Sequence, residues 1–362
     1  MGLTVPPTEP PVFFTGPATG TTMEPLHTGL CAELDVDHPV VQAPVGSVST
    51  PALAAAVADA GGLGMLAMSW READAIREAY TAAAAATDGV VGANVVLDES
   101  TGVLSPSACL DACLDAGASV VSFSFGDAEP YIDRVHAVGG TVLVTVGSAG
   151  EARTAVAAGA DIVVAQGREA GGHVQSDVTT LALLPRVADA VEVPVVAAGG
   201  LGDGRGLAAA LTLGADGGWF GTRFVATEES GAHETYRERI VDAPETATRL
   251  TDLFDRGWPD QPHRVLETDA VSRTDAPDPA ATSTEGEQGR TPERVARTAD
   301  GEPVYRRADT PPLDGMDGDL AALPHYAGQS VGLAQDVVPA GEVVDRLVAE
   351  ARTALADAVP SE

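Results

Sequence analysis

Lysine is absent from this chain of 362 residues, so every basic residue in its count of 21 Lys+Arg is an arginine. The absence excludes a lysine Schiff base and with it a pyridoxal-phosphate enzyme, because both need the lysine amine. It also excludes a P-loop, whose lysine reaches the phosphates of the nucleotide. The chemistry of the chain must therefore use other side chains, or a cofactor that is held without lysine.

Positive charge as a whole is scarce. There are 53 Asp+Glu against the 21 arginines, which gives a formal net charge of −32. Such a charge excludes nucleic acid as a partner, because phosphate backbones bind to basic surfaces. The acidic residues are spread over nearly every expected helix and loop, whereas an acidic partner-binding protein would gather them in one tail or patch. This spread is typical of a halophilic protein, in which concentrated salt screens the self-repulsion.

Cysteines and long apolar runs are also few. Cys31, Cys109 and Cys113 do not make a disulfide framework. Cys109 and Cys113 share a helix face at their spacing, and without further ligands nearby they indicate two small buried side chains and no metal site. No stretch reaches the roughly 20 apolar residues of a membrane span, and residues 1–10 lack a signal-peptide pattern. We therefore expect a cytoplasmic protein without membrane contact.

Short apolar runs alternate with alanine-rich amphipathic segments over most of the chain. The runs are rich in Val, Ile and Ala, as in strands buried on both faces. The expected strands are 39–43, 64–68, 90–97, 119–124, 141–146, 161–166, 193–198 and 217–220, and the expected helices are 51–60, 71–86, 107–116, 129–138, 149–158, 181–191 and 206–213. This alternation favours a (β/α)8 TIM barrel over an open doubly wound sheet, because no G-x-G-x-x-G follows an early strand and glycine turns follow several strands.

The remaining segments lie on either side of the expected barrel. Residues 1–28 form an N-terminal extension rich in Pro, Thr and Gly, and the barrel occupies 29–240. A connection over 241–325 contains a long acidic insertion, about 268–312, which we expect to be mostly exposed and partly disordered. The segment 326–362 carries a helix over about 340–357 whose apolar face returns to pack on the barrel.

The loop after the sixth expected strand is the most informative segment. Gln166 ends an apolar run, and the glycines that follow it, such as Gly171 and Gly172, let a flat ligand approach the backbone. His173 closes the loop and is its only side chain with an ordinary pKa near neutrality. The other six histidines lie in segments without converging polar groups. We therefore expect His173 to be catalytic, beside a bound cofactor.

Other polar residues gather at the carboxyl ends of the strands, where barrels have their active sites. Gln42 closes the first strand, Asn94 interrupts the third, and Ser122 and Ser124 lie near the end of the fourth. Because a buried amide has to find partners, Asn94 and Gln166 are candidates for the polar edge of a flat ring, with a core hydrogen bond as the alternative.

Two glycine turns predict a phosphate site. Gly199-Gly200 follows the seventh strand and Gly221-Thr222 follows the eighth. Barrels often bind phosphate at these two loops, through backbone N–H groups and a nearby helix N-terminus. The Thr222 hydroxyl adds a further donor. One such glycine turn on its own is common in ordinary loops, but the presence of both turns in this order favours a phosphate-binding site.

These motifs, taken in order, resemble the nitronate monooxygenase family, formerly called 2-nitropropane dioxygenases and related to the flavin-dependent enoyl-acyl-carrier-protein reductases. The similarity spans about 34–355. It rests on V-Q-A-P at 41–44, V-S-T-P at 48–51, A-G-G-L-G at 60–64, Q-G-R-E-A-G-G-H at 166–173, A-A-G-G at 197–200, G-T-R-F at 221–224, F-D-R-G-W-P-D-Q-P-H-R-V-L at 254–266 and G-Q-S at 328–330.

The resemblance implies a barrel that binds FMN non-covalently. Asn94 and Gln166 match positions that touch the isoalloxazine in the family, and His173 matches the histidine that acts on the substrate. The positions that we assign to the cofactor on this basis are Gln42, Ala43, Pro44, Asn94, Gln166, Gly171, Gly172, Gly199, Gly200, Trp219, Phe220, Gly221, Thr222 and Gln329. The family often has Gln where Trp219 stands, Met at Val45, and a small residue and Gly after His173, so this chain departs from the pattern mainly in the substrate pocket.

The resemblance also implies a reaction, the FMN-dependent oxidation of alkyl nitronates by O2 to a carbonyl compound and nitrite. The flavin would carry the redox chemistry. Two alternatives stay open, an NAD(P)H-dependent reductase of enoyl thioesters or quinones and a flavin-binding barrel without turnover. The expected partners are a nitronate or other small anion and O2, while NAD(P)H and a homodimer remain open. Arg168 or Arg223 is a candidate to offset the net charge of −32 near an anionic substrate.

Overall fold

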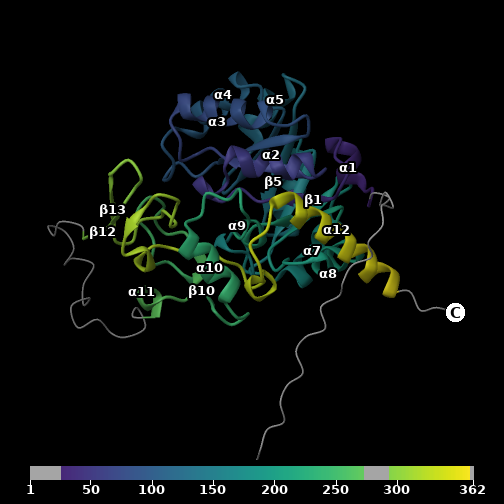
Figure 1. Cartoon of the computed structure of the whole chain (residues 1–362). Coiled ribbons are helices and arrows are strands. Elements are labelled where there is room, and N and C mark those ends of the chain that lie inside the picture. The colour runs from purple at the N-terminus through teal and green to yellow at the C-terminus, as the bar shows by residue number, and fades with distance from the viewer. Residues whose placement is uncertain (1–25, 273–292, 359–362) are drawn as a thin grey trace, which may run out of the picture.

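Eight parallel strands close into a barrel at the centre of the computed structural model, which describes residues 26–272 and 293–358 (Figure 1). The order around the barrel is β1-β2-β3-β4-β5-β6-β8-β9. The strands are β1 (Val40–Gln42), β2 (Leu63–Ala67), β3 (Val91–Val96), β4 (Val120–Ser124), β5 (Thr141–Val146), β6 (Ile162–Gln166), β8 (Val195–Ala198) and β9 (Gly217–Phe220). The predicted TIM barrel is confirmed, and each predicted strand matches one of these.

The helices follow the strands in the expected alternation. They are α1 (Gly29–Leu34), α2 (Pro51–Asp59), α3 (Ala73–Ala85), α4 (Pro106–Asp115), α5 (Glu129–His136), α6 (Ala149–Ala157), α7 (Thr180–Ala188), α8 (Gly204–Thr212), α9 (Thr222–Val225), α10 (Glu234–Asp242), α11 (Asp269–Ser272) and α12 (Ala340–Asp357). α4 carries Cys109 and Cys113, which are both buried as predicted. Within the described residues, no helix has the length and apolarity needed to cross a membrane.

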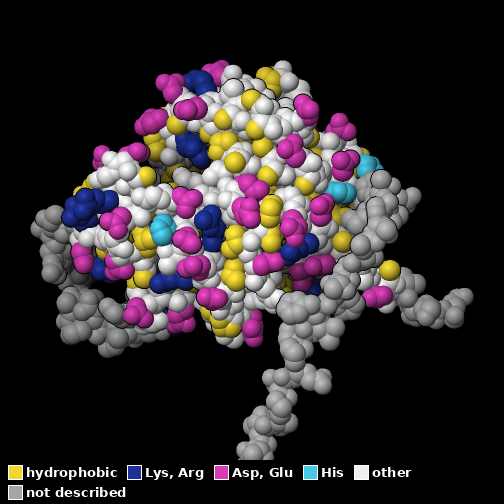
Figure 2. Space-filling view, viewed as in Figure 1, with side chains coloured by type: hydrophobic (Ala, Val, Ile, Leu, Met, Phe, Trp, Pro, Cys, Tyr) yellow, Lys and Arg dark blue, Asp and Glu magenta, His cyan; other side chains and the backbone are white. Residues whose placement is uncertain are grey.

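The acidic side chains lie scattered across the visible face of the molecule and do not form one patch (Figure 2). Arginines are interspersed among them, and several form ion pairs, such as Arg134 with Asp111 and Arg346 with Asp336. The distribution agrees with the sequence pattern. Its connection with concentrated salt stays a prediction.

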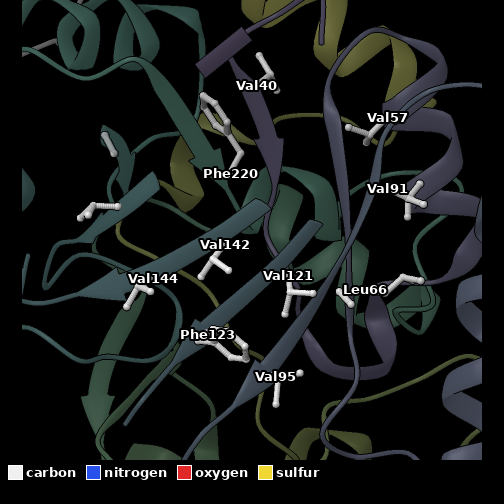
Figure 3. Packing of buried hydrophobic residues seen from close by; sticks show 14 of the residues in the cluster. Val40, Val57, Leu66, Val91, Val95, Val121, Phe123, Val142, Val144 and Phe220 are labelled. Atoms are coloured by element: carbon white, nitrogen blue, oxygen red, sulfur yellow. The ribbon is translucent and has the colours of Figure 1, made fainter. Parts of the chain in front are cut away.

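A layer of apolar side chains joins the barrel to its helices. Val121 and Phe123 on β4 lie beside Val142 and Val144 on β5 in this layer (Figure 3). Because successive strand residues point to opposite faces, Val120 belongs to a second apolar cluster. Burial on both faces explains why the strands consist of continuous runs of Val, Ile and Ala.

Helix α12 returns to the barrel, as predicted. Val344, Leu347 and Val348 on its apolar face are buried in the same layer as the strand residues. The backbone of α8 comes close because it begins with Gly204, where a Cβ atom would lie 2.4 Å from the carbonyl oxygen of Leu347. The Gly204 N–H also donates to Glu350 Oε2 over 2.8 Å, so this contact between the two helices depends on a glycine.

The connection after the barrel supplies all the strands of two small sheets except β7 (Gly172–His173), which lies in the loop after β6. One has the order β10-β11-β7, from β7, β10 (Thr248–Thr251) and β11 (His263–Leu266), and the other has the order β13-β12-β14, from β12 (Arg294–Arg297), β13 (Pro303–Tyr305) and β14 (Asp317–Gly318). The predicted insertion at 268–312 includes 273–292, which lies outside the described residues, as does most of the extension at 1–28. The expected disorder of the insertion therefore stays a prediction. Its described part, 293–312, includes residues that line the cavity at the barrel mouth.

Candidate active site

A cavity of about 400 Å³ lies at the carboxyl ends of the barrel strands, where a TIM barrel is expected to carry its active site. Its volume lies within the range of small-molecule and cofactor sites. Most of the predicted site residues line it, namely Ala43, Pro44, Asn94, Gln166, Gly171, Gly172, His173, Gly199, Gly200, Trp219, Gly221 and Thr222. The structure thus brings together residues that are as far apart in the chain as 43 and 222.

Three predicted cofactor residues, Gln42, Phe220 and Gln329, are not among the residues that line the cavity. Gln42 is fully buried, where its Nε2 donates to Ser49 Oγ (3.0 Å) and its Oε1 accepts from the Met65 N–H (3.0 Å). Phe220 packs in the apolar layer shown in Figure 3. Their placement follows from strand alternation, which turns their neighbours toward the ligand space.

Gln329 is exposed, while its neighbours Gly328 and Ser330 line the cavity. The backbone N–H of Gln329 donates to the carbonyl oxygen of Glu169 over 2.9 Å. This residue therefore helps to hold two loops together through its main chain, and its side chain does not reach the cavity.

Asn94 and Gln166 both line the cavity and both have hydrogen bonds to the protein. The Asn94 amide donates to Ser122 Oγ over 2.7 Å. The Gln166 amide donates to the carbonyl oxygen of His173 (3.2 Å), and its Oε1 accepts from the Gln175 N–H (2.8 Å). The sequence left a ring contact and a core hydrogen bond open; the second is present, and Gln166 uses it to fix the loop that carries His173.

Glycines let the backbone reach the cavity at the two predicted phosphate turns. Gly199 and Gly200 have φ angles of +93° and +76°, which favour glycine. A Cβ atom on Gly221 would contact only the Cβ of Ala43, at 3.6 Å, so the space beside this residue is open. At Gly171 a Cβ atom would lie 2.5 Å from the backbone nitrogen of Gly328. The backbone shape of this side of the cavity therefore depends on residues without side chains.

The imidazole of His173 is buried at the cavity. Its strand β7 pairs with β11, opposite His263, and its ring stacks on Trp258 with centroids 4.0 Å apart and an interplanar angle of 30°. Nε2 is buried without a hydrogen-bond partner and lies 3.7 Å from Asp309 Oδ1. Burial, together with the nearby His263, lowers the pKa of His173 to about 3. The ring is therefore neutral near pH 7, and its Nε2 makes no hydrogen bond within the protein.

The prediction that the other histidines lack converging polar groups is wrong for His263. This residue is fully buried, and its ring centroid lies 5.2 Å from that of His173. Its Nδ1 donates to the Gln261 carbonyl oxygen (3.0 Å), and its Nε2 accepts from the Phe254 N–H (3.2 Å). Both ring nitrogens are satisfied by the neutral form, and burial lowers the pKa of His263.

Asp309 is a functional candidate that the sequence did not reveal. Its carboxylate lies at the cavity and accepts a hydrogen bond from the Tyr326 hydroxyl. Burial raises the pKa of Asp309 to about 7, against the opposing effect of this hydrogen bond. Nothing in a segment so rich in acidic residues distinguishes this one Asp from its exposed neighbours, so no sequence signal was available.

Besides Trp219 on β9, four aromatic side chains line the cavity and form what we call the aromatic wall, namely Trp70, Phe125, Trp258 and Tyr326. Trp258 lies at its centre, with Phe125 at 4.7 Å and Trp70 at 5.8 Å between ring centroids. Its Nε1 donates to Asp98 Oδ2 over 2.9 Å. Phe125 has a φ of +58°, an uncommon conformation for a bulky residue that is often found at functional sites. Aromatic residues are only 4% of the chain and these four are far apart in it, so only the fold reveals that they group at the cavity.

Neither of the two arginines that the sequence offered as partners for an anion lines the cavity. Arg223 is buried and pairs with Asp336 (2.7 Å), and Arg168 pairs with Asp177 (3.1 Å) on the surface. Among the described residues that line the cavity there is no arginine, and Asp309 is the one carboxylate. An anionic ligand would therefore have to be held by hydrogen-bond donors.

The sequence of this chain is similar to a known protein family and to several named enzymes. The family model described as nitronate monooxygenase matches residues 28–105 and 105–350. A protein of Rhodococcus jostii named (3aS,4S,5R,7aS)-5-hydroxy-7a-methyl-1-oxo-octahydro-1H-indene-4-carboxyl-CoA dehydrogenase is 40% identical over 250 residues, which are 69% of this chain and 68% of that protein. A nitronate monooxygenase of Paraburkholderia phytofirmans is 31% identical and covers 89% of this chain and 94% of its own length.

Solved structures show the same fold. FabK from Thermotoga maritima superposes with a TM-score of 0.76 at 31% identity, covering 92% of this chain and 98% of its own. A nitroalkane oxidase from Streptomyces ansochromogenes superposes with a TM-score of 0.74 at 33% identity, covering 92% of this chain and all of its own.

Proposed function

Because the chain belongs to the nitronate monooxygenase family, and thus to a group of oxidoreductases, we propose that it oxidises alkyl nitronates with O2 to a carbonyl compound and nitrite, using FMN. The observation that carries the proposal is the neutral, buried His173, which lines the cavity and whose Nε2 has no hydrogen-bond partner in the protein. A group with these properties is suited to hold or move a proton on a bound substrate.

The residues at the cavity fit FMN. Gly199, Gly200, Gly221 and Thr222, which we call the phosphate corner, line the cavity with backbone that has no side chain at three positions and with one hydroxyl. Thr222 Oγ1 accepts from the Gly328 N–H over 2.9 Å and so keeps its own proton for donation to a phosphate oxygen. Asn94 and Gln166 are suited to lie near the isoalloxazine, to which the bound cofactor would bring the redox chemistry.

A nitronate would be held by neutral donors. His173 in its Nε2–H form donates one hydrogen bond, and Asp309 donates another while it is protonated, which its pKa of about 7 allows below neutrality. Preorganised donors in a dry site stabilise an anion more strongly than they would in water. The aromatic wall would cover the alkyl group and exclude water.

A second candidate acts on an acyl thioester, and two observations favour it. The Rhodococcus relative named as a CoA dehydrogenase is 40% identical, above the 31% of the Paraburkholderia nitronate monooxygenase. The described residues that line the cavity also include no arginine, so no positive charge of that kind would hold a nitronate anion there. This candidate corresponds to the NAD(P)H-dependent reductase of enoyl thioesters or quinones that the sequence left open.

Steady-state assays separate the two candidates. Nitrite and carbonyl product should form from an alkyl nitronate in an O2-dependent reaction. The assay is run in concentrated KCl because we propose, from the net charge of −32, a halophilic protein, which we also propose to be cytoplasmic. Activity with NADPH and an enoyl thioester, together with no nitrite from nitronates, would select the second candidate. Absence of both activities in protein that has bound FMN would favour a barrel without turnover.

A further inference from the structure

We propose that Asp309 is a second proton acceptor in this cavity, which takes over the proton that His173 removes from a neutral nitroalkane. The inference rests on the proposed function and adds a residue to it. It concerns proton transfer alone. The substrate C–H bond breaks, its electron pair moves into the nitro group to give the nitronate, and the proton goes first to His173 Nε2 and then to the Asp309 carboxylate.

Three buried side chains from separate segments, those of His173, Asp309 and Tyr326, lie close together at the cavity. His173 Nε2 and Asp309 Oδ1 are 3.7 Å apart, with only 9% and 5% of the two side chains exposed. This separation is longer than a hydrogen bond, and a small side-chain movement closes it. Catalytic hydrogen bonds are often long until the substrate is bound.

Asp309 is held in place independently of His173. Its carboxylate accepts from the Tyr326 hydroxyl, whose ring centroid lies 5.7 Å from that of His173. Its backbone N–H donates to the Arg256 carbonyl oxygen over 2.9 Å. Asp309 is thus fixed through both its side chain and its backbone, and its carboxylate lies near an imidazole nitrogen that has no hydrogen-bond partner. Among the salt bridges of the described residues, the contact with His173 is the one that involves Asp309.

The environment of the pair decides where a proton rests. His263 and Tyr326 face it most closely, Asp98 approaches through its hydrogen bond to Trp258, and the Arg307–Asp255 ion pair lies beside the same segment. Burial lowers the pKa of His173 to about 3 and raises that of Asp309 to about 7. A proton taken up by the imidazole is therefore more stable on the carboxylate.

The ionisation of Asp309 should make the rate of nitroalkane oxidation depend on pH. Below about pH 7 Asp309 already holds a proton and has no room for that of the substrate, whereas above this pH it is ionised and can accept. Oxidation of a neutral nitroalkane should therefore increase as the pH rises through about 7. A nitronate, which needs no deprotonation and is repelled by the ionised carboxylate, should show the opposite trend.

The experiment compares nitroethane, added as the neutral acid, with ethyl nitronate. For Asp309→Asn we expect the ratio of nitroethane to nitronate kcat/KM to fall by about 10²–10⁴-fold, the usual range for a positioned side chain that takes part in proton transfer. Its nitroethane rate should also lose the rise near pH 7. Asp309→Glu should restore part of the ratio and of the pH dependence. Asp314→Asn is the matched control, because Asp314 is exposed in the same segment and does not line the cavity.

Infrared spectroscopy adds a readout that needs no turnover. A band of a protonated carboxylic acid should titrate near pH 7 in the parent protein and in Asp314→Asn, and should be missing in Asp309→Asn. An unchanged substrate ratio and pH profile in an Asp309→Asn protein that still binds FMN would overturn the inference. If the parent protein oxidises neither substrate, the proposed function fails, and the absence of the infrared titration would then refute the Asp309 assignment separately.

Discussion

The cavity has two unlike sides. The phosphate corner and the loop at Gly171 present backbone and small residues, in which two successive φ values are positive. The aromatic wall, with His173 and Asp309, presents large and titratable side chains that belong partly to the connection after the barrel. The first arrangement is suited to a ligand that must come close to the main chain. The second is suited to chemistry and to the choice of substrate, so changes on the two sides should have separable effects.

The largest expected effect is the loss of FMN on changing the phosphate corner. In Gly200→Val with Thr222→Val, a β-branched side chain stands at a φ of +76° and the hydroxyl that faces Gly328 is gone. We expect the purified double variant to be colourless, as measured by absorbance and by the FMN released on denaturation.

A matched control separates strain from cofactor contact. Gly139 also has a φ of +76°, is exposed and has no atom within 4 Å of a Cβ position, so Gly139→Val carries the same backbone cost, about 1–3 kcal/mol, without touching the cavity. It should keep its FMN. A yellow, fully loaded corner variant would contradict the phosphate assignment.

The next effect concerns His173 and should spare the cofactor. His173→Ala is expected to retain FMN and to lose about 10²–10⁴-fold in turnover, since the protein then lacks its proton-handling group. Nitrite release and bound FMN are measured on the same sample. His136→Ala, which removes a surface histidine paired with Asp161, should behave as the parent does. Full activity of the His173 variant would refute its role.

Trp258→Ala should have a smaller effect on the rate and a clear effect on stability. The ring supports His173 by stacking and is almost completely buried, so its loss misplaces the imidazole and costs about 3–5 kcal/mol of unfolding free energy. A rate loss of up to about 10²-fold is expected from such misplacement. Chemical denaturation and nitrite release measure the two effects, and Trp258→Phe, which keeps a ring, should recover much of each. An alanine variant with the parent rate would show that the wall does not position His173.

The smallest expected effect is that of salt on an anionic substrate. The described lining residues include no arginine to offset the net charge of −32, so added KCl should screen the repulsion and lower the KM for a nitronate severalfold. Neutral nitroethane is the control and should change less, measured over concentrations at which the fold is intact. An equal response of both substrates would show that the salt acts on the protein alone.

The barrel side of the cavity was predictable because its signals are local. Gln166, Gly171 and Gly200 stand next to strand ends that apolar runs mark clearly, and a barrel brings such ends together. Gln42 and Phe220 were misplaced, since a shift of one residue along a strand reverses the face of a side chain.

The side of the cavity with the aromatic wall, His173 and Asp309 could be predicted from the sequence only in part. Asp309 and Tyr326 reach His173 through the small sheets and loops of the connection, and no periodicity in the sequence predicts which loop residue will meet a given histidine. His263 became recognisable only through the pairing of β11 with β7, which joins residues 90 positions apart. Distant pairing of this kind depends on the folded chain, so the composition of its segments does not reveal it.

The most direct test of the account is an absorbance spectrum of the purified protein in concentrated KCl, recorded before and after anaerobic addition of an alkyl nitronate. We expect a flavin spectrum that bleaches when the nitronate is added. A flavin spectrum that persists with nitronate and bleaches with NADPH would contradict nitronate oxidation and support the reductase. A protein with no flavin spectrum would contradict the cofactor site itself.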